Sequence, residues 1–259
     1  MTSAMQLQSV THSFNGVCVI DGISLEVKAG EIVAVVGPSG CGKSTLLRIA
    51  AGLLTPSGGS VHAHDERIGF VFQDSALLPW RKVMDNAKLL ASRNDDAFVA
   101  SLLESAGLST HLNKWPHELS GGMKMRLSLV RTLAMRPSVV LADEPFGALD
   151  QITRHHLHDE LLDLHSKSPF AMVIVTHAID EAVYLADRVI TMSPAPGRFV
   201  ATTEVRFDHP RTSDLRYTAA FGELCGRVAS TLNDASSLQR GSAVQVDSTP
   251  KRTASRGTT

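Results

Sequence analysis

The sequence lacks the features that mark secreted and membrane-spanning proteins. Its three cysteines are odd in number and widely spaced, which argues against a disulfide framework and favours free thiols in a reducing compartment. No basic flank followed by an apolar stretch opens the chain, so we expect no secretory signal. The most apolar region, 127–142, is broken by two arginines and a proline, whereas a membrane span needs roughly 20 apolar residues. We therefore expect that the chain does not cross a bilayer.

The bulk composition is that of an ordinary globular protein. Hydrophobic residues make up 43% of the 259 residues and charged residues 20%, which is enough apolar material for a substantial core. The formal net charge of −1 is far from the basic balance of nucleic-acid binders, so no nucleic-acid partner is predicted. From about residue 234 the chain is polar and poor in apolar residues. This predicts a disordered tail over 234–259, after a domain over 1–233.

Short apolar runs alternate with helical patterns along the chain. The opening segment is predicted as strands and turns, and the stretch 83–119 is helical in pattern. The alternation predicts an α/β fold with a mostly parallel core sheet, in which a helical insertion at about 75–136 separates two strands. Strands are predicted at 32–36, 68–72, 139–142, 171–176 and 189–192, and the strand at 189–192 is expected to be the final one. Helices are predicted from about residue 43 and over 122–135, 151–166 and 180–186.

A glycine-rich loop between a predicted strand and a predicted helix matches the pattern G-x-x-x-x-G-K-[ST]. Glycines let successive backbone N–H groups turn onto phosphate oxygens, and the helix N-terminus adds its positive end. The lysine supplies a mobile charge to the outer phosphates of ATP, and the serine hydroxyl that follows it is a hard ligand for Mg²⁺. The segment comprises Gly37, Pro38, Ser39, Gly40, Cys41, Gly42, Lys43, Ser44 and Thr45.

Two acidic residues end the apolar strand predicted at 139–142. Adjacent strand residues point to opposite faces, so Asp143 and Glu144 cannot do the same work. In P-loop enzymes an aspartate at this strand end holds Mg²⁺. Glu144 is then free to face the γ-phosphate and to act as general base on the attacking water.

Further motifs, in the order of the family, resemble those of the ABC ATPases. The resemblance covers about residues 5–201 and implies a P-loop NTPase core with a mostly parallel sheet, an antiparallel β N-terminal subdomain and an inserted α-helical subdomain. Every catalytic position carries the expected residue type, which argues for an active ATPase. The matches are Phe14 at the place of the adenine-stacking aromatic, Gln73 at the Q-loop, LSGGM at 119–123 for the signature motif, GALD at 147–150 for the D-loop, and His177 as the switch histidine.

The resemblance implies a homodimer in which two copies of the chain share each ATP. Ser120, together with the amides of Gly121 and Gly122, would contact the γ-phosphate held by the partner's phosphate loop. Asp150 would cross the dimer interface. Hydrolysis would weaken the dimer, and this open–closed cycle would move the attached membrane subunits.

The resemblance also assigns roles around the γ-phosphate. Gln73 would join Ser44 and Asp143 around Mg²⁺ and sense the γ-phosphate. His177 would hydrogen-bond the γ-phosphate, beside the general base Glu144.

The branch of the family that the chain resembles most is the nitrate/sulfonate/taurine importer group. The LLPW stretch at 77–80, the Gly-Gly-Met of the signature and the later PGR at 196–198 carry this likeness. It implies two transmembrane permease subunits, a solute-binding protein, and a peripheral place on the cytoplasmic face of the inner membrane. Importers of thiamine-precursor pyrimidines and other small organic molecules belong to the same group, so the substrate stays open, and a soluble ABC ATPase outside transport is a further alternative.

Two positions depart from the family pattern. Met125 stands where relatives usually carry Gln, and Ala178 follows the switch histidine where Asp is common. Neither position contacts ATP in the family picture, so we expect an effect on rate rather than on function.

Two features admit alternative interpretations. Trp80 is either a packed aromatic of the helical insertion or part of a groove that receives a short helix of the membrane subunit. The histidines 155, 156 and 158 invite a metal site. A solvated or half-buried helix flank, with His158 and His165 at the edge of the buried face, is the interpretation we favour, and we take the same view of His62 and His64.

Overall fold

The computed structural model describes residues 2–65 and 67–244. Its centre is a six-stranded sheet in the order β5-β6-β7-β3-β8-β9, in which all neighbours are parallel except the antiparallel edge pair β8 and β9. The apolar runs predicted as strands form its interior, and β3 and β7 are buried along their whole length. The strands are β3 (Ile32–Val36), β5 (Ile68–Val71), β6 (Val139–Asp143), β7 (Ala171–Thr176), β8 (Arg188–Met192) and β9 (Phe199–Glu204).

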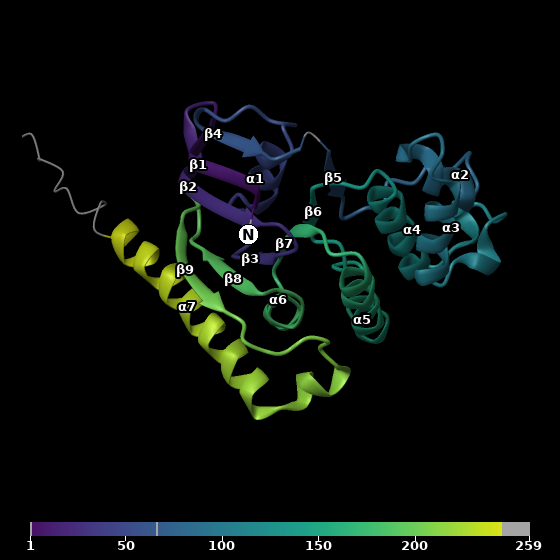
Figure 1. Cartoon of the computed structure of the whole chain (residues 1–259). Coiled ribbons are helices and arrows are strands. Elements are labelled where there is room, and N and C mark those ends of the chain that lie inside the picture. The colour runs from purple at the N-terminus through teal and green to yellow at the C-terminus, as the bar shows by residue number, and fades with distance from the viewer. Residues whose placement is uncertain (1, 66, 245–259) are drawn as a thin grey trace, which may run out of the picture.

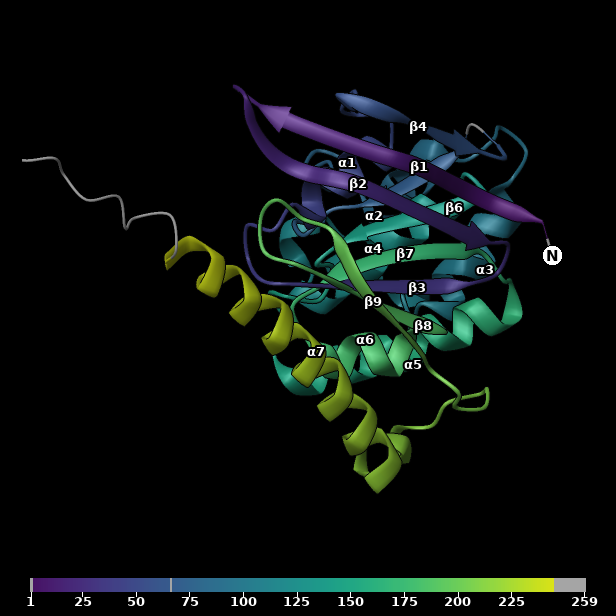
Figure 2. The ribbon, with the colours of Figure 1, turned by 90° about the vertical axis from the view of Figure 1, so that its left-hand side faces the viewer.

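A second sheet of three antiparallel strands lies against one face of the first, at the top of Figure 1. It contains β1 (Ser3–Phe14), β2 (Val17–Lys28) and β4 (Gly58–Ala63), in the order β2-β1-β4. Strands β1 and β2 run side by side over their length (Figure 2). Apolar side chains of both sheets and of helix α1 (Lys43–Ala50) form one continuous core cluster between them.

The other helices form a core layer and a side lobe. Helices α5 (Gln151–Lys167) and α6 (Ile179–Leu185) cover the opposite face of the six-stranded sheet. The lobe lies to one side of the sheet (Figure 1) and is inserted between β5 and β6. It holds α2 (Val83–Ala87), α3 (Asp96–Ser105) and α4 (Gly121–Leu133), with short 3₁₀ turns at 88–90, 109–111 and 116–118. This arrangement confirms the predicted α/β class, with an antiparallel β subdomain and an inserted helical subdomain. Over residues 2–65 and 67–244, no helix combines the length and the apolar character of a membrane span.

The C-terminal part differs from the sequence prediction in two ways. The strand at 188–192 is not the final one, because β9 follows it as an edge strand whose residues alternate between half-buried and exposed. Helix α7 (Ala219–Val244) packs on α6 and β8, and its far end projects beyond the body of the molecule (Figures 1 and 2). The prediction of disorder is therefore wrong for 234–244, while 245–259 lie outside the described residues. The buried side chains of Phe221, Leu224 and Val228 anchor the N-terminal half of α7. From there, each added residue gains one hydrogen bond as the helix continues.

The burial of His158 also differs from the sequence prediction. It is 1% exposed, whereas the helical pattern placed it on a solvated or half-buried flank. His155 and His165 are half-buried and His156 is exposed, as are His62 and His64. The stripe of leucines on α5 marks the face that meets the sheet, but His158 is covered by other elements, α6 and the chain beyond it, which helical periodicity does not reveal.

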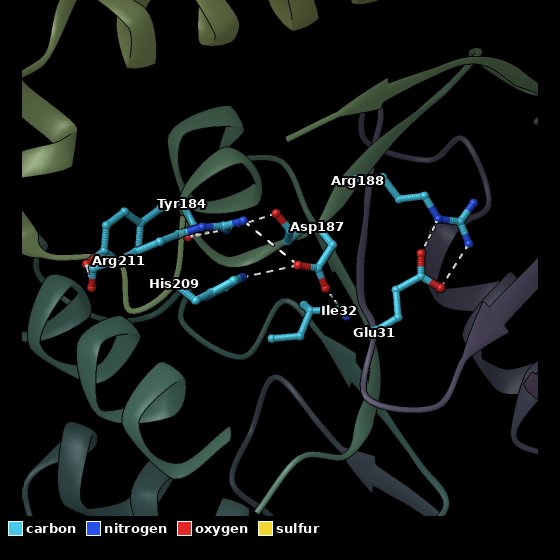
Figure 3. A network of polar contacts seen from close by, with 8 residues as sticks. Glu31, Ile32, Tyr184, Asp187, Arg188, His209 and Arg211 are labelled. Atoms are coloured by element: carbon cyan, nitrogen blue, oxygen red, sulfur yellow. Dashed lines mark hydrogen bonds and ion pairs between the residues drawn. The ribbon is translucent and has the colours of Figure 1, made fainter. Parts of the chain in front are cut away.

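A polar network fastens the segment before α7 to the core (Figure 3). The Asp187 carboxylate accepts hydrogen bonds from the Ile32 N–H at 2.8 Å and from His209 Nε2 at 3.2 Å. The buried Arg211 guanidinium donates to the carbonyls of Tyr184 and Ala186, at 2.8 and 2.9 Å, where α6 ends. A cation at this place satisfies carbonyls that a helix C-terminus leaves open. The chain between β9 and α7 is thereby held against the sheet and α6.

Candidate active site

The glycine-rich loop joins β3 to α1 and is shaped by residues with positive φ. Gly40 has φ +77° and Gly42, the residue before α1, has φ +103°. A Cβ at Gly42 would lie 3.2 Å from the Val19 carbonyl oxygen and 3.2 Å from Ile20 Cγ1. Strand β2 thus presses against the loop from outside. A side chain at Gly42 would meet both an unfavourable backbone conformation and a neighbour at close range.

Lys43 and Ser44 open α1 and face inward. The Lys43 ammonium is buried and donates to the carbonyls of Gly37 at 2.8 Å and Pro38 at 3.0 Å. These loop carbonyls hold the charge in the place where phosphate oxygens are expected. Burial raises the pKa of the neighbouring Cys41 thiol, so it stays protonated and acts as an apolar filler under the loop.

Ser44 and Asp143 bring two hard oxygen groups together. The Ser44 hydroxyl donates to Asp143 Oδ1 at 2.8 Å, which joins the start of α1 to the end of β6. A hydroxyl and a carboxylate are the donors that Mg²⁺ prefers, with phosphate oxygens and water completing its shell. Across the described ranges 2–65 and 67–244, no group of three or more His, Cys, Asp or Glu side chains is arranged to hold a metal ion. The chemistry of this pair fits an ion shared with phosphates rather than an all-protein cage.

Glu144 and His177 meet across the carboxyl ends of β6 and β7. His177 Nδ1 lies 3.1 Å from Glu144 Oε2, and the His177 side chain is 60% exposed. Glu144 has φ +44°, a left-handed conformation that few non-glycine residues adopt. Its N–H donates to the Val175 carbonyl, which fixes this backbone against β7. Strained conformations of this kind gather at active sites.

One hollow collects these groups. Its lining comprises Val19, Ser39, Gly40, Gly42, Lys43, Ser44, Thr45 and Glu144. The structure therefore brings the glycine-rich loop and the candidate general base to the same place. The arrangement can bind a phosphate chain and present a carboxylate to its far end.

Phe14 lies at the turn between β1 and β2. It is 47% exposed, and its ring meets that of His12 edge-on with 4.5 Å between centroids. Residue pairing sets His12 opposite Ile20, and Ile20 and Val19 lie beside the phosphate loop at Gly42. An exposed ring two residues beyond His12 is suited to stacking on a base. His12 is buried with no hydrogen-bond partner among the described residues, and no sequence pattern predicts its contact with Phe14.

Gln73 lies just beyond β5 and is exposed. Strand β5 pairs with β6 in parallel, so Gln73 stands at the same sheet edge as Asp143. The loop that follows Gln73 is held by two polar side chains that sequence reasoning missed. Arg131 donates to the carbonyls of Ser75 and Ala76, and the fully buried Asn86 bonds both backbone groups of Leu78. A polar residue on the buried face of a helical pattern is the only sequence signal for such a role.

Trp80 is 70% exposed in that loop. Of the two interpretations of Trp80, the packed aromatic is wrong. Leu77 and Leu78 beside it are half-buried.

The LSGGM segment lies outside the hollow. Ser120 caps α4 by accepting from the Met123 N–H at 3.3 Å, and it is exposed with Gly121. A Cβ at Gly122 would lie 2.8 Å from Thr153 Cγ2, so the start of α4 packs on the start of α5. None of the three residues predicted for the γ-phosphate lines the hollow in the described part of the chain.

Asp150 caps α5 in the same way. Its carboxylate accepts from the Thr153 N–H at 3.0 Å. This hydrogen bond lowers the pKa of Asp150, so the group is ionised at neutral pH. Asp150 is exposed beside the LSGGM segment and does not line the hollow either.

The two departures from the family pattern have different surroundings. Met125 is 6% exposed and belongs to the main core cluster, where an apolar side chain is at home. Ala178 precedes α6 at the capping position and offers no side-chain acceptor, and its N–H donates to Thr176 Oγ1 at 3.0 Å instead. Neither residue lines the hollow.

Comparison with known proteins adds to this geometry. Residues 20–147 match a family model described as ABC transporter. An ATP-binding protein of Brucella abortus is 40% identical over 241 residues, covering 88% of this chain and 93% of that protein. The aliphatic sulfonates import ATP-binding protein SsuB 1 of Pseudomonas syringae pv. syringae is 43% identical over 210 residues, covering 81% of this chain and 89% of that protein.

Solved structures with this architecture include a part of an ABC transporter complex and an ATP-binding cassette. CbiO1 from Clostridium perfringens, described as part of the ABC transporter complex cbiONQ, has a TM-score of 0.72 at 25% identity, covering 80% of this chain and 90% of that chain. The ATP-binding cassette MJ0796, described as a dimer in a post-hydrolysis state bound to ADP and Pi, has a TM-score of 0.67 at 30% identity. That match covers 79% of this chain and 100% of the other.

Proposed function

This chain belongs to the ATP-binding, ATP-hydrolysing subunits of ABC transporters, and we propose that it energises the import of sulfonate-like organic anions. One observation supports placing this activity at particular residues: Ser44 and Glu144 line one hollow together with the glycine-rich loop, and they contact Asp143 and His177 respectively. The substrate class rests on the relatives named for aliphatic sulfonate import. Importers of nitrate and of thiamine-precursor pyrimidines belong to the same group, so both remain alternative substrates.

The contacts of the phosphate-binding residues support the roles that we propose for them. Lys43 exchanges its bonds to the two loop carbonyls for bonds to the outer phosphate oxygens of ATP. Backbone N–H groups of the loop and the start of α1 hold the remaining oxygens. Ser44, Asp143 and Gln73 are the ligands for Mg²⁺, which when bound neutralises charge on the phosphates.

Glu144 is the general base of this proposal. Its carboxylate lines the hollow and takes a proton from the water that attacks the γ-phosphate. His177 shares a hydrogen bond with Glu144 and reaches the γ-phosphate from its exposed position.

The position of the LSGGM segment supports a dimer. Ser120, Gly121 and Gly122 have no phosphate to contact in their own subunit, because they lie outside its hollow. The exposed N-terminus of α4 can instead complete the hollow of a second copy, where its N–H groups meet the γ-phosphate. Asp150 stands beside it on the same surface. The dimeric cassette among the similar structures agrees with this arrangement.

The loop at 75–82 is the proposed contact with the membrane subunits. Arg131 and Asn86 hold its backbone, so it keeps one shape while it presents Trp80 to solvent. It follows Gln73 directly and leads into the helical lobe, so a change at the γ-phosphate reaches it over a few residues. Two permease subunits and a solute-binding protein complete the proposed complex. Within it, this chain lies on the cytoplasmic face of the inner membrane.

Growth tests the substrate class. A strain without this gene is expected to fail on ethanesulfonate or taurine as the sole sulfur source and to grow normally on sulfate. The wild-type gene is expected to restore growth, and the Glu144→Gln gene is not. Normal growth of the deletion strain on both sulfonates, with loss of nitrate or pyrimidine-precursor use, would contradict the sulfonate assignment and leave the ATPase assignment standing.

A further inference from the structure

Phe146, two residues after Glu144, begins a series of contacts that runs through the protein interior to helix α5. Phe146 is 4% exposed, and it anchors the turn in which the Gly147 N–H donates to the Glu144 carbonyl. The ring of Phe146 meets the ring of His158 edge-on, with 4.8 Å between centroids. The turn that carries Glu144 therefore packs on His158 through Phe146.

Both nitrogens of His158 are used. Arg216 Nη2 lies 3.2 Å from Nδ1, and Nε2 lies 3.2 Å from Glu181 Oε2. A guanidinium can only donate, so Nδ1 accepts and Nε2 carries the hydrogen that it donates to the carboxylate. The ring is thus held in one orientation and one tautomer.

Glu181 extends the contacts to α6. It is 2% exposed, and its second oxygen has no hydrogen-bond partner among the described residues. A buried carboxylate with a single donor depends strongly on that donor. His177, which contacts Glu144, stands four residues before Glu181 and two residues before α6 begins. Three side-chain contacts and two short chain segments, 144–146 and 177–181, therefore close a ring: Glu144, Phe146, His158, Glu181, His177 and back to Glu144.

The chain between β9 and α7 supports this ring from outside. Arg216, in the 3₁₀ turn Ser213–Tyr217, lies over the Tyr184 ring with 3.2 Å to its centroid. Its Nη1 is 3.2 Å from Asp159 Oδ1, which also accepts from the Tyr184 hydroxyl at 2.6 Å. Burial raises the pKa of Tyr184 to about 12, so this hydroxyl keeps its proton and remains a donor.

We infer that His158 is a positioning residue for ATP hydrolysis. It holds the turn after Glu144 and the helix after His177 in one relative position, in which the two side chains reach each other. The inference rests on the proposed roles of Glu144 and His177. A misplacement of about 1 Å at reacting groups can cost about 100-fold in rate, so loosening this support lowers turnover while the phosphate loop, which His158 does not touch, still binds ATP.

His165 offers a matched control on the same helix. It is half-buried, meets the Phe170 ring edge-on at 5.1 Å and hydrogen-bonds the Phe170 carbonyl at 3.0 Å. Its packing resembles that of His158, but its contacts lie away from Glu144 and α6. A change at His165 therefore reports the cost of removing a packed histidine from α5 without disturbing the ring of contacts.

The experiment compares kcat and the Kd for ATP in the full chain across five variants. His158→Leu is expected to lower kcat about 10- to 100-fold with Kd unchanged. His158→Gln, which keeps a donor and an acceptor, recovers most of the rate, and His165→Leu keeps the parental rate. The double variant His158→Leu/Glu181→Leu leaves no buried carboxylate without its donor, so it folds even if His158→Leu does not, and its kcat is expected to stay low.

The outcomes separate the two proposals. Glu144→Gln, assayed beside the others, tests the general base: turnover near the parental rate there would overturn the proposed role of Glu144. If Glu144→Gln is inactive while the folded double variant hydrolyses ATP at the parental rate, only the role of His158 is overturned. An equal loss of kcat in His165→Leu would also overturn it, because a general loss of packing would then explain the effect.

Discussion

Replacing Gly42 by alanine is expected to weaken ATP binding more than the same change at Gly40. At Gly40, φ is +77° and nothing lies within 4 Å of an added Cβ, so only the left-handed backbone is penalised, by about 1–2 kcal/mol. At Gly42, φ is +103° and the added Cβ lies 3.2 Å from the Val19 carbonyl oxygen and 3.2 Å from the Cγ1 atoms of Val19 and Ile20 in β2. Overpacking of this kind adds about 1–2 kcal/mol to a similar backbone penalty.

These penalties translate into affinity because the loop can escape them by leaving its binding conformation. ATP then has to restore that conformation, and the apparent Kd rises by the factor by which the competent population falls. With about 1.4 kcal/mol for each tenfold change, Gly40→Ala raises Kd about 5- to 30-fold and Gly42→Ala about 30- to 700-fold.

Equilibrium titration with ATP, without turnover, measures both variants against the parent. Gly22→Ala is the control outside the loop, because Gly22 also has a positive φ, +66°, and open space around it. It is expected to leave Kd unchanged. An equal loss at Gly40 and Gly42 would show that backbone strain alone decides, and parental affinity in Gly42→Ala would show that β2 does not constrain the loop.

Three further predictions concern other parts of the molecule. Phe14→Ala removes a stacking surface worth about 1–3 kcal/mol and is expected to raise the Kd for ATP without changing the preference among bases; an unchanged Kd would mean that another residue holds the adenine. Burial lowers the pKa of His165 below its ordinary 6.5, so on acidification the unfolded chain takes up a proton before the folded chain does, and stability falls as the pH drops below that value. His165→Gln is therefore expected to show a smaller decrease in Tm than the parent between about pH 7.5 and 5.5. An equal decrease in both would refute His165 as a source of this acid sensitivity. Charged residues at Leu78 and Trp80 are expected to abolish uptake in cells and to spare ATP hydrolysis in detergent; normal uptake would place the membrane contact elsewhere.

The elements that the sequence predicted well are those with strong local signals. The spacing of glycines and lysine at 37–45 predicts the phosphate loop because few other structures need that pattern, and the apolar runs at 139–142 and 171–176 are recovered as buried parallel strands. Edge strand β9 was missed because its half-exposed alternation resembles a polar loop. The extent of α7 was missed because Ser and Thr weaken its helical pattern, while its anchoring contacts are tertiary.

The candidate site was predictable in its membership and not in its geometry. Motif order predicts that Glu144 and His177 belong to one site, but the φ of +44° at Glu144 follows from its bond to Val175 in a neighbouring strand. Likewise, the ring of His158 is held by a hydrogen bond to a carboxylate 23 residues away. Such contacts between distant segments determine the positions of the side chains in a site, and helical periodicity does not predict them.

The shared site is the central claim, and mixing two inactive variants tests it most directly. Lys43→Ala disables the loop of its own subunit, and Ser120→Arg disables the segment offered to the partner. In a mixed dimer both defects fall in one site, and the other site combines an intact loop with an intact LSGGM segment. With random pairing in equal amounts, half of the dimers are mixed and each has one intact site of two, so the mixture is expected to hydrolyse ATP at about a quarter of the parental rate. A mixture as inactive as its two components would contradict the shared site.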